Sequence, residues 1–219
     1  MDTHIAVLGA TGRVGALVAR QALDRGWSVA ALVRDPARLA VGLAGTDRLR
    51  VVAGQIDDPV AMAEATREAS AVVVAVGVRY RRGHPWSGIQ GREDVAPQAV
   101  RTALRTAPHG ARIVLLSALG VGDSWRLLPG PVRAVLSTSS LPRVYRALGE
   151  AERLVLGAAT PGVVVRAVTL TDGPATGRAD ATGRPLRGNP KVSRADVAGL
   201  LLDAAAAGTG RSRVLVAAS

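Results

Sequence analysis

The feature that most constrains the fold of this chain is a glycine-rich loop near its start. The sequence Gly-Ala-Thr-Gly-Arg-Val-Gly occupies residues 9–15, after the apolar run from Ile5 to Leu8. That run predicts a buried strand, and the alanine- and valine-rich segment from Arg13 to Leu23 predicts a helix. The free N–H groups and the dipole at the start of such a helix create roughly half a positive charge. The loop is therefore predicted to bind a phosphate group.

Each glycine of this loop has its own expected role. Gly9 allows a tight turn, Gly12 leaves room for a pyrophosphate, and Gly15 lets the helix pack closely on the sheet. The spacing is G-x-x-G-x-x-G, which differs slightly from the usual dinucleotide fingerprint. Glycine also occurs before helices for reasons of backbone conformation alone. The loop therefore indicates a dinucleotide site only together with its surroundings.

Two arginines follow the second apolar run, Ser28 to Val33. In a dinucleotide fold the end of this strand faces the adenosine ribose, where an acidic residue binds a free 2′-hydroxyl and an arginine accommodates a 2′-phosphate. Arg34 stands at this point, and Arg38 follows one helical turn later. The pair favours NADP(H) over NAD(H). The alternative is that arginine is simply abundant here, since all but one of the 28 basic residues are arginine.

Short apolar runs alternate with helical stretches along the whole chain. The expected strands are Ile5–Leu8, Val29–Val33, Leu49–Ala53, Ala71–Val76, Arg112–Leu116, Gly162–Arg166 and Arg213–Val216, and the expected helices lie near 13–25, 59–68, 92–107, 143–157 and 194–207. This order predicts an α/β fold: a single doubly wound Rossmann domain over residues 1–219, with about seven mostly parallel strands and helices on both faces. The irregular stretches 77–91, 117–141 and 167–192 leave the carboxyl edge of that sheet. They are the predicted walls of a substrate pocket.

The last predicted helix begins with a capping signature. Ser193 precedes it, and Asp196 stands at its third position. This arrangement is similar to a capping box, in which the two side chains satisfy free N–H groups at the helix start. We interpret both residues as structural.

Composition excludes several other classes of protein. The 219 residues include 48% hydrophobic residues, which suits one domain, and no apolar run is long enough to span a membrane. Cysteine is absent, no secretion signal is recognisable, and the three histidines lack metal-ligand spacing. The alanine- and arginine-rich composition is typical of a bacterium with a GC-rich genome. We expect a cytoplasmic bacterial protein that binds neither metal nor membrane.

The formal net charge of +11 raises the question of nucleic-acid binding. The arginines are dispersed along the chain instead of gathering on one helix, so we do not expect a nucleic-acid partner. Their densest cluster is Arg79, Arg81 and Arg82, with His84 and Trp86 close behind. Because it follows a predicted strand, the cluster suggests a small-molecule substrate that is acidic, and a solvated loop is the alternative. The oligomeric state is left open.

Six segments together resemble a known family. They are GATGRVG at 9–15, ALVRDPARL at 31–39, AVVVAVG at 71–77, IVLLSALG at 113–120, RAVTLTDGPATGR at 166–178 and VSRADVAGLLLDA at 192–204. The chain resembles the atypical short-chain dehydrogenase/reductases, in particular the small NAD(P)-binding proteins similar to biliverdin/flavin reductase and to NmrA-like proteins. The resemblance covers nearly the whole chain.

This resemblance implies an NADP(H) site, and it assigns residues to each part of the cofactor. They are Gly9, Thr11, Gly12, Arg13 and Val14 at the pyrophosphate, Arg34 and Arg38 at the 2′-phosphate, Gln55 and Ile56 beside the adenine, Val76 and Gly77 under the ribose, Ser117 facing the nicotinamide, and Leu170 covering it. At Gln55 an amide replaces the carboxylate that relatives usually carry. Cofactor binding is expected to survive that change.

The residues for catalysis depart further from the family pattern. Dehydrogenases use a tyrosine whose phenolate is favoured by a lysine four residues later. Here Tyr145 is followed at that distance by Gly149, and an alternative alignment offers Leu148. Two functions remain open. The first is an NADP(H)-dependent oxidoreductase that transfers a hydride to a flavin, quinone or conjugated carbonyl, with Ser117 and Tyr145 as candidate catalytic residues. The second is a catalytically silent NADP(H)-binding redox sensor or regulatory protein.

Overall fold

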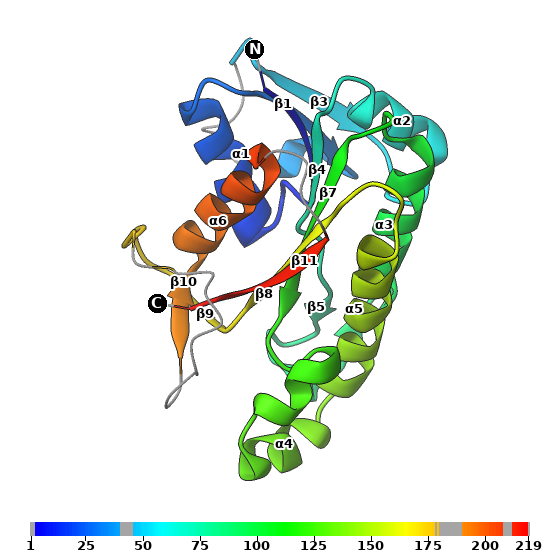
Figure 1. The fold of residues 1–219 in the computed structure, drawn as a ribbon. Coiled ribbons are helices and arrows are strands. Elements are labelled where there is room, and N and C mark those ends of the chain that lie inside the picture. The colour runs from blue at the N-terminus through cyan, green and yellow to red at the C-terminus, as the bar shows by residue number, and fades with distance from the viewer. Residues whose placement is uncertain (1–2, 40–45, 178, 180–189, 208–211, 219) are drawn as a thin grey trace.

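The computed structural model describes residues 3–39, 46–177, 179, 190–207 and 212–218. Within these residues, seven parallel strands form one sheet in the order β11-β8-β7-β4-β1-β2-β3 (Figure 1). Its strands are β1 His4–Leu8, β2 Ser28–Val33, β3 Leu49–Ala53, β4 Ala71–Val74, β7 Arg112–Ala118, β8 Val163–Ala167 and β11 Arg213–Ala217. The predicted α/β fold with a doubly wound parallel sheet is confirmed.

Helices cover both faces of the sheet (Figure 1). On one face, the buried side chains of α1 (Arg13–Asp24) and α6 (Arg194–Ala206) pack together with the strands. On the other face lie α2 (Pro59–Thr66), α3 (Val95–Thr106) and α5 (Leu141–Leu156), which form a second apolar cluster. The two clusters sandwich the sheet, as expected for parallel strands that are buried on both faces.

The direction of each strand side chain follows from the period of two along a strand. Along β7, Ile113 and Leu115 belong to the cluster under α3 and α5, whereas Val114 belongs to the cluster under α1 and α6. Ser117 continues the first series, so it lies on the α5 side of the sheet. The alternation of side chains along β7 therefore directs the candidate site residue Ser117 toward α5.

The chain order of the strands creates a switch point between β1 and β4. From β1 the chain runs outward through β2 to β3, and from β4 it runs the other way through β7 and β8 to β11. The loops after β1 and β4 therefore leave the sheet side by side at its carboxyl edge. Ligands of doubly wound folds bind in the crevice at this point.

Short elements that were not predicted from the sequence lie after β2 and in the stretches expected to be irregular. They are the antiparallel pair β5 (Arg79–Tyr80) and β6 (Ile89–Gln90), the parallel pair β9 (Thr169–Thr171) and β10 (Lys191–Ser193), the 3₁₀ helices Pro36–Arg38, Pro85–Ser87 and Gly122–Leu127, and the helix α4 (Gly130–Ser137). Such short elements carry too little hydrophobic periodicity to be recognised. Residues 178 and 180–189 of the predicted loop 167–192 lie outside the described residues.

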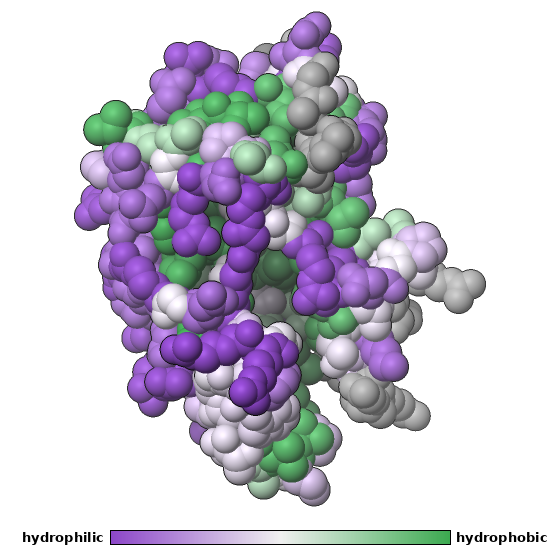
Figure 2. All heavy atoms as spheres, turned by 180° about the vertical axis from the view of Figure 1, so that it is seen from behind, coloured by the Kyte–Doolittle hydropathy of each residue, from purple (hydrophilic) through white to green (hydrophobic). Residues whose placement is uncertain are grey.

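The molecular surface is largely hydrophilic on the face shown in Figure 2. Green atoms are visible at the projecting lower end, where Figure 1 places α4. Leu127, Val132 and Val135 are exposed in this part of the chain. Among the described helices, none is both long and apolar enough to cross a membrane.

Candidate functional site

The glycine-rich loop packs tightly against the end of β4. Gly9 has a φ of 96°, which favours glycine, and a Cβ placed on it would lie 2.7 Å from the carbonyl oxygen of Ala75. A Cβ on Gly15 would overlap the carbonyl oxygen of Gly9. The Gly12 N–H donates to that same oxygen at 2.8 Å, which closes the turn. Gly9 and Gly15 are therefore required by the packing of the loop itself.

Gly12 differs from the other two glycines, because its backbone conformation does not require glycine and a Cβ placed on it would make one tight contact instead of an overlap. Its φ of −89° and ψ of 163° are extended values that any residue adopts. Among the described atoms outside its immediate neighbours, only the Gly9 oxygen, at 3.1 Å, lies within 4 Å of a Cβ placed there. The space in front of Gly12 is therefore left open at the start of α1, and its helix cap has no side-chain hydrogen bond. This cradle fits a pyrophosphate.

The neighbours of Gly12 in the loop have different surroundings. Thr11 is half-buried, Val14 is buried against α6, and Arg13 is exposed. The Arg13 Nη1 lies 3.6 Å from a carboxylate oxygen of Asp172, which also accepts a 2.7 Å hydrogen bond from Arg194. Asp172 thus links the loop to the start of α6. Arg13 lies beside the open cradle, as the pyrophosphate assignment requires.

The two arginines after β2 are exposed and available to a ligand. Asp35 caps the short helix that carries Arg38, because its carboxylate accepts a 3.1 Å hydrogen bond from the Ala37 N–H. In the part of the chain that the structure describes, neither Arg34 nor Arg38 forms an ion pair with a carboxylate. Two uncompensated guanidinium groups therefore lie where a 2′-phosphate is expected.

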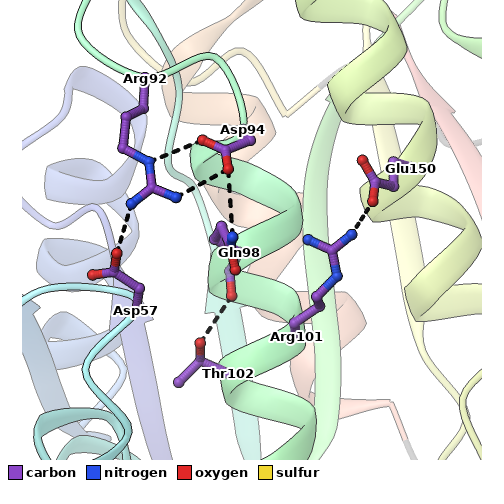
Figure 3. Close-up of polar contacts among 7 residues, drawn as sticks. All are labelled: Asp57, Arg92, Asp94, Gln98, Arg101, Thr102 and Glu150. Carbon is purple, nitrogen blue, oxygen red and sulfur yellow. Dashed lines mark hydrogen bonds and ion pairs between the residues drawn. The ribbon is translucent and has the colours of Figure 1, made fainter.

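The loop after β3 holds the predicted adenine contacts, and an ion-pair cluster fixes it in place (Figure 3). Gln55 is exposed and Ile56 is half-buried in this loop. Arg92 donates to Asp57 at 2.6 Å and to both carboxylate oxygens of Asp94 at 2.9 Å. These hydrogen bonds from Arg92 lower the pKa of Asp94. Arg92 therefore ties the adenine-side loop to the start of α3.

The loop after β4 is open toward the crevice. Gly77 is exposed, and no described atom lies within 4 Å of a Cβ placed on it. Val76 is half-buried on the α3 and α5 side of the sheet. Leu170, on the far side of the crevice in β9, is half-buried on the α1 and α6 side. The structure thus brings the first glycine loop and the chain around Ala75 into contact, and leaves a free backbone surface beside them.

Ser117 lies at the end of β7 in a buried network of charged groups. Its hydroxyl donates a 2.6 Å hydrogen bond to Glu152 on α5. Glu152 also accepts two hydrogen bonds from Arg166 on β8, at 2.6 and 3.0 Å, and Arg166 donates to Asp123 at 2.7 Å. Ser117, Glu152 and Arg166 are each at most 6% exposed. While this network holds, the Ser117 oxygen can accept a hydrogen bond, but its only proton is engaged.

The charges in this network shift the pKa values of its members. The hydrogen bonds that Arg166 donates to Glu152 raise the pKa of Arg166, despite the opposing effect of burial. The hydrogen bond from Arg166 lowers the pKa of the exposed Asp123. Both shifts favour the charged forms of Arg166 and Asp123.

Tyr145 lies near the start of α5 and packs against Trp125. The two rings meet edge to face, with centroids 6.1 Å apart and an interplanar angle of 83°. Burial raises the pKa of the Tyr145 phenol, and the neighbouring Tyr80 adds to the rise. A tyrosine–lysine pair would lower it. Tyr145 therefore keeps its proton, and can act as a hydrogen-bond donor but not as a phenolate.

The arginine cluster after β4 lies on an exposed hairpin. Arg79 is part of β5, and Arg81 and Arg82 follow in the turn toward β6. All three are exposed, and no ion pair links them to a carboxylate among the described residues. They remain candidates for contact with an acidic ligand. Across all of the residues that the structure describes, no group of three or more histidine or acidic residues could hold a metal ion.

Comparison with known proteins settles the family. A family model described as NAD(P)H-binding matches residues 9–207. The chain belongs to this NAD(P)H-binding family. The match begins at the first glycine of the loop and includes all of the helices named above, which is consistent with a dinucleotide in the crevice at the switch point.

Several solved structures share the fold of this NAD(P)H-binding protein. ChuY, an anaerobillin reductase from Escherichia coli, is 26% identical, with a TM-score of 0.76 over 98% of this chain and 96% of that chain. A short-chain dehydrogenase/reductase from Veillonella parvula in complex with NADP is 15% identical, with a TM-score of 0.78 over 100% of this chain and 95% of that chain. A protein described as a putative epimerase from Bacteroides thetaiotaomicron is 19% identical, with a TM-score of 0.74 over 100% and 97%. The resemblance to the atypical short-chain dehydrogenase/reductases is confirmed.

Sequence reasoning missed the partners of Ser117. Glu152, Arg166 and Asp123 are far apart along the chain, and each alone is an ordinary charged residue. A signal was nevertheless present, because Glu152 falls among apolar positions of an amphipathic helix and Arg166 ends an apolar strand. Two opposite charges at buried positions predict a pair.

Proposed function

We propose that this protein is an NADP(H)-dependent reductase that transfers a hydride to a small electron-poor acceptor such as a flavin, a quinone or a conjugated carbonyl. The observation that supports this most is the open cradle at Gly12, followed after β2 by the exposed Arg34 and Arg38, which form no ion pair with a carboxylate of the described residues. When bound, NADPH supplies the hydride. The similarity to ChuY, whose description names a reductase, supports the same reaction class. The cysteine-free composition supports a place in the cytoplasm.

The residues of this chain then have separate roles in the proposal. The backbone at Gly12 holds the pyrophosphate, and Arg34 with Arg38 holds the 2′-phosphate. Glu152 fixes the Ser117 hydroxyl at 2.6 Å, so that its oxygen is presented as a hydrogen-bond acceptor at the end of β7. Tyr145 keeps a protonated phenol, which can donate a hydrogen bond to an acceptor where negative charge develops.

Calorimetric titration tests the cofactor assignment. The parent protein should bind NADP⁺ at least about tenfold more tightly than NAD⁺, because a charge-assisted hydrogen bond contributes about 1.5–3 kcal/mol. Arg34→Ala should remove most of this preference. Arg105→Ala is the matched control, because Arg105 is an exposed arginine near the end of α3. Equal affinities for both cofactors, or an Arg34→Ala variant that keeps the preference, would overturn the assignment.

A second function is favoured by the residue four positions after Tyr145, where dehydrogenases carry a lysine. Gly149 stands there, and the pKa of Tyr145 is raised, so the usual relay of a dehydrogenase is lacking. We therefore propose a silent NADP(H)-binding redox sensor as the alternative. NADPH oxidation with a panel of flavins, quinones and enones decides between them. Tight cofactor binding without oxidation by any acceptor would favour the sensor, and turnover with one of them would favour the reductase.

A further inference from the structure

A cavity of about 650 Å³ lies beside α5, and none of the residues assigned to the dinucleotide lines it. Its lining comes from one face of α5, from the chain that follows β7, and from the end of β8. The volume falls in the range of about 300–1,000 Å³ that is usual for pockets that bind small molecules. The pocket therefore has the size of a ligand site of its own.

The apolar part of this pocket suits a flat ligand. Trp125 and Tyr145 form an edge-to-face pair on its wall, and Leu156 closes the far end. Gly149 stands between them in the interior of α5, where a Cβ would meet only the Val121 Cγ1, at 3.6 Å. A glycine inside a helix costs stability, and here no close contact requires it. Its effect is to leave the helix face bare and the pocket open.

The charged part of the pocket has an excess of positive groups. Both of its acidic residues, Asp123 and Glu152, are already bound to Arg166. Arg146 and Arg153 are exposed on the same face of α5, two turns apart, on either side of Gly149. Within the described chain neither forms an ion pair, and Arg153 makes only a 3.3 Å hydrogen bond to its own helix backbone. Their long side chains can converge above Gly149.

We propose that this pocket binds a small aromatic or conjugated carboxylate, with its flat body against Trp125, Tyr145 and the bare backbone of Gly149, and its carboxylate held by Arg146 and Arg153. Planar guanidinium groups bind carboxylates in two-point geometry, which favours this anion. Tyr145 on its wall is also the proposed hydrogen-bond donor to the hydride acceptor, so the pocket names the chemical class of that acceptor and in this respect rests on the proposed function. Its residues differ from those of the dinucleotide cradle, so both sites can be filled at once.

Binding of 2-naphthoate to the full-length protein tests the proposal, with 2-naphthamide as a neutral probe of the same shape. Calorimetry gives the affinity, and quenching of tryptophan fluorescence reports contact with Trp125. We expect 2-naphthoate to bind at least about tenfold more tightly than the amide, because the neutral amide forms no ion pair with arginine and lacks the second acceptor oxygen that a two-point contact needs. Equal binding of both probes, or binding of neither at millimolar concentration, would overturn the proposal.

Variants separate the two parts of the pocket. The double variant Arg146→Gln/Arg153→Gln should bind both probes with equal affinity, whereas Arg105→Gln, the same charge change on α3, should keep the preference for the carboxylate. Gly149→Leu should abolish binding of both probes, because its side chain fills the pocket. Circular dichroism and a thermal unfolding curve show whether that variant is folded, and Gly149→Ala provides a smaller obstruction if it is not. A double arginine variant that keeps the preference would contradict the assigned carboxylate contacts.

A last titration separates this pocket from the cofactor crevice. The affinity for 2-naphthoate should stay within about threefold when NADP⁺ is saturating, because the two sites share no residue. Arg34→Ala should leave 2-naphthoate binding unchanged. Loss of 2-naphthoate binding in the presence of NADP⁺ would mean that the probe occupies the crevice, and would overturn the proposal even if the protein proves to be a reductase.

Discussion

The glycine loop at the start of α1 and the charged network at the ends of β7 and β8 are built in opposite ways. In the loop, Gly9, Gly12 and Gly15 lie within seven residues, and their backbone atoms form the cradle. In the network, 35 residues separate Ser117 from Glu152, and 43 separate Asp123 from Arg166. The first region is a local motif of backbone conformation, whereas the second exists only after the sheet has formed.

This difference determines what each region can tolerate. The loop lacks a side chain at Gly12, where we propose that the pyrophosphate binds, so a substitution there adds atoms to that space. The network consists of buried charges, so a substitution there removes a partner and leaves another charge uncompensated. We therefore expect changes at Gly12 to affect cofactor binding mainly, and changes in the network to affect folding mainly.

The largest effect is expected for Glu152→Ala. This change leaves the buried Arg166 with only the exposed Asp123 as a partner, and leaves Ser117 without its acceptor. Removal of one partner from a buried ion pair costs about 3–5 kcal/mol. Urea unfolding should show a loss of this size in the free energy of unfolding.

The control for this change is Glu150→Ala, on the same helix. Glu150 pairs with Arg101 of α3 at a partly exposed position (Figure 3). Exposed pairs contribute about 0–1 kcal/mol, so this variant should unfold almost like the parent protein. Similar losses in the two variants would show that the buried network is no more important for folding than a surface pair.

Gly12→Val should have the next largest effect, on binding and not on folding. The backbone of Gly12 is extended, so valine fits its conformation, but the side chain enters the space left for the pyrophosphate. NADP⁺ affinity should fall at least about a hundredfold, which corresponds to about 2.8 kcal/mol. Titration calorimetry measures it, and circular dichroism should show an unchanged fold.

Gly15→Ala tests the difference between a glycine required by packing and Gly12 within the same loop. A Cβ at this position overlaps the Gly9 carbonyl oxygen, so this variant should lower the thermal unfolding midpoint while Gly12→Val leaves it nearly unchanged. Retained NADP⁺ binding in a folded Gly12→Val variant would place the phosphates elsewhere.

The same contrast explains how much of the molecule the sequence could predict. The core strands and α1 were predictable because hydrophobic periodicity is a local signal, and Gly9 to Gly15 were recognisable for the same reason. For Gly12 we expected a space for phosphate, which stays a prediction, and the structure adds that the backbone conformation at this position does not itself require glycine.

The network and the pocket beside α5 were not predictable in this way. Sequence reasoning assigned Ser117 as a candidate catalytic residue. Its hydroxyl proton is engaged by Glu152, a contact set by the register of β7 with β8 and by the packing of α5. Likewise, Gly149 was noticed only as a missing lysine. Its place in a pocket wall depends on Trp125 and Arg166, which chain folding brings to the same pocket.

Asp196 combines the two kinds of region, because it belongs to a local helix cap and also binds residues that are distant in the sequence. The pH dependence of protein stability tests what its carboxylate contributes. The predicted cap is present: the Ser193 oxygen accepts a 2.9 Å hydrogen bond from the Asp196 N–H. Asp196 in addition accepts hydrogen bonds from Ser193, Thr176 and the Gly177 N–H, at 2.8–3.0 Å. Burial acts to raise the pKa of Asp196, but these hydrogen bonds outweigh it, and the pKa is lowered.

Because the pKa of Asp196 is lower in the folded state, its carboxylate stabilises the protein above the ordinary aspartate pKa. That stabilisation is lost as the pH falls through the lowered value. Asp196→Ala should therefore cost about 2 kcal/mol of unfolding free energy at pH 7, and the difference from the parent should shrink as the pH falls below about 4. Urea unfolding at several pH values measures it, and a difference independent of pH would mean that the carboxylate charge contributes nothing.

The smallest effect, and the one that bears most on the pocket, is expected for Gly149→Ala. An alanine in a helix interior is about 0.5–1 kcal/mol more stable than a glycine, and the nearest atom to its Cβ would be the Val121 Cγ1 at 3.6 Å, an ordinary contact. The free energy of unfolding should therefore rise by about that amount, as urea unfolding would show. A rise means that the native glycine is retained at a cost to the helix, as a pocket wall requires. A fall would mean that α5 packs more closely at this position than its backbone indicates, and would make Gly149 a packing residue like Gly15.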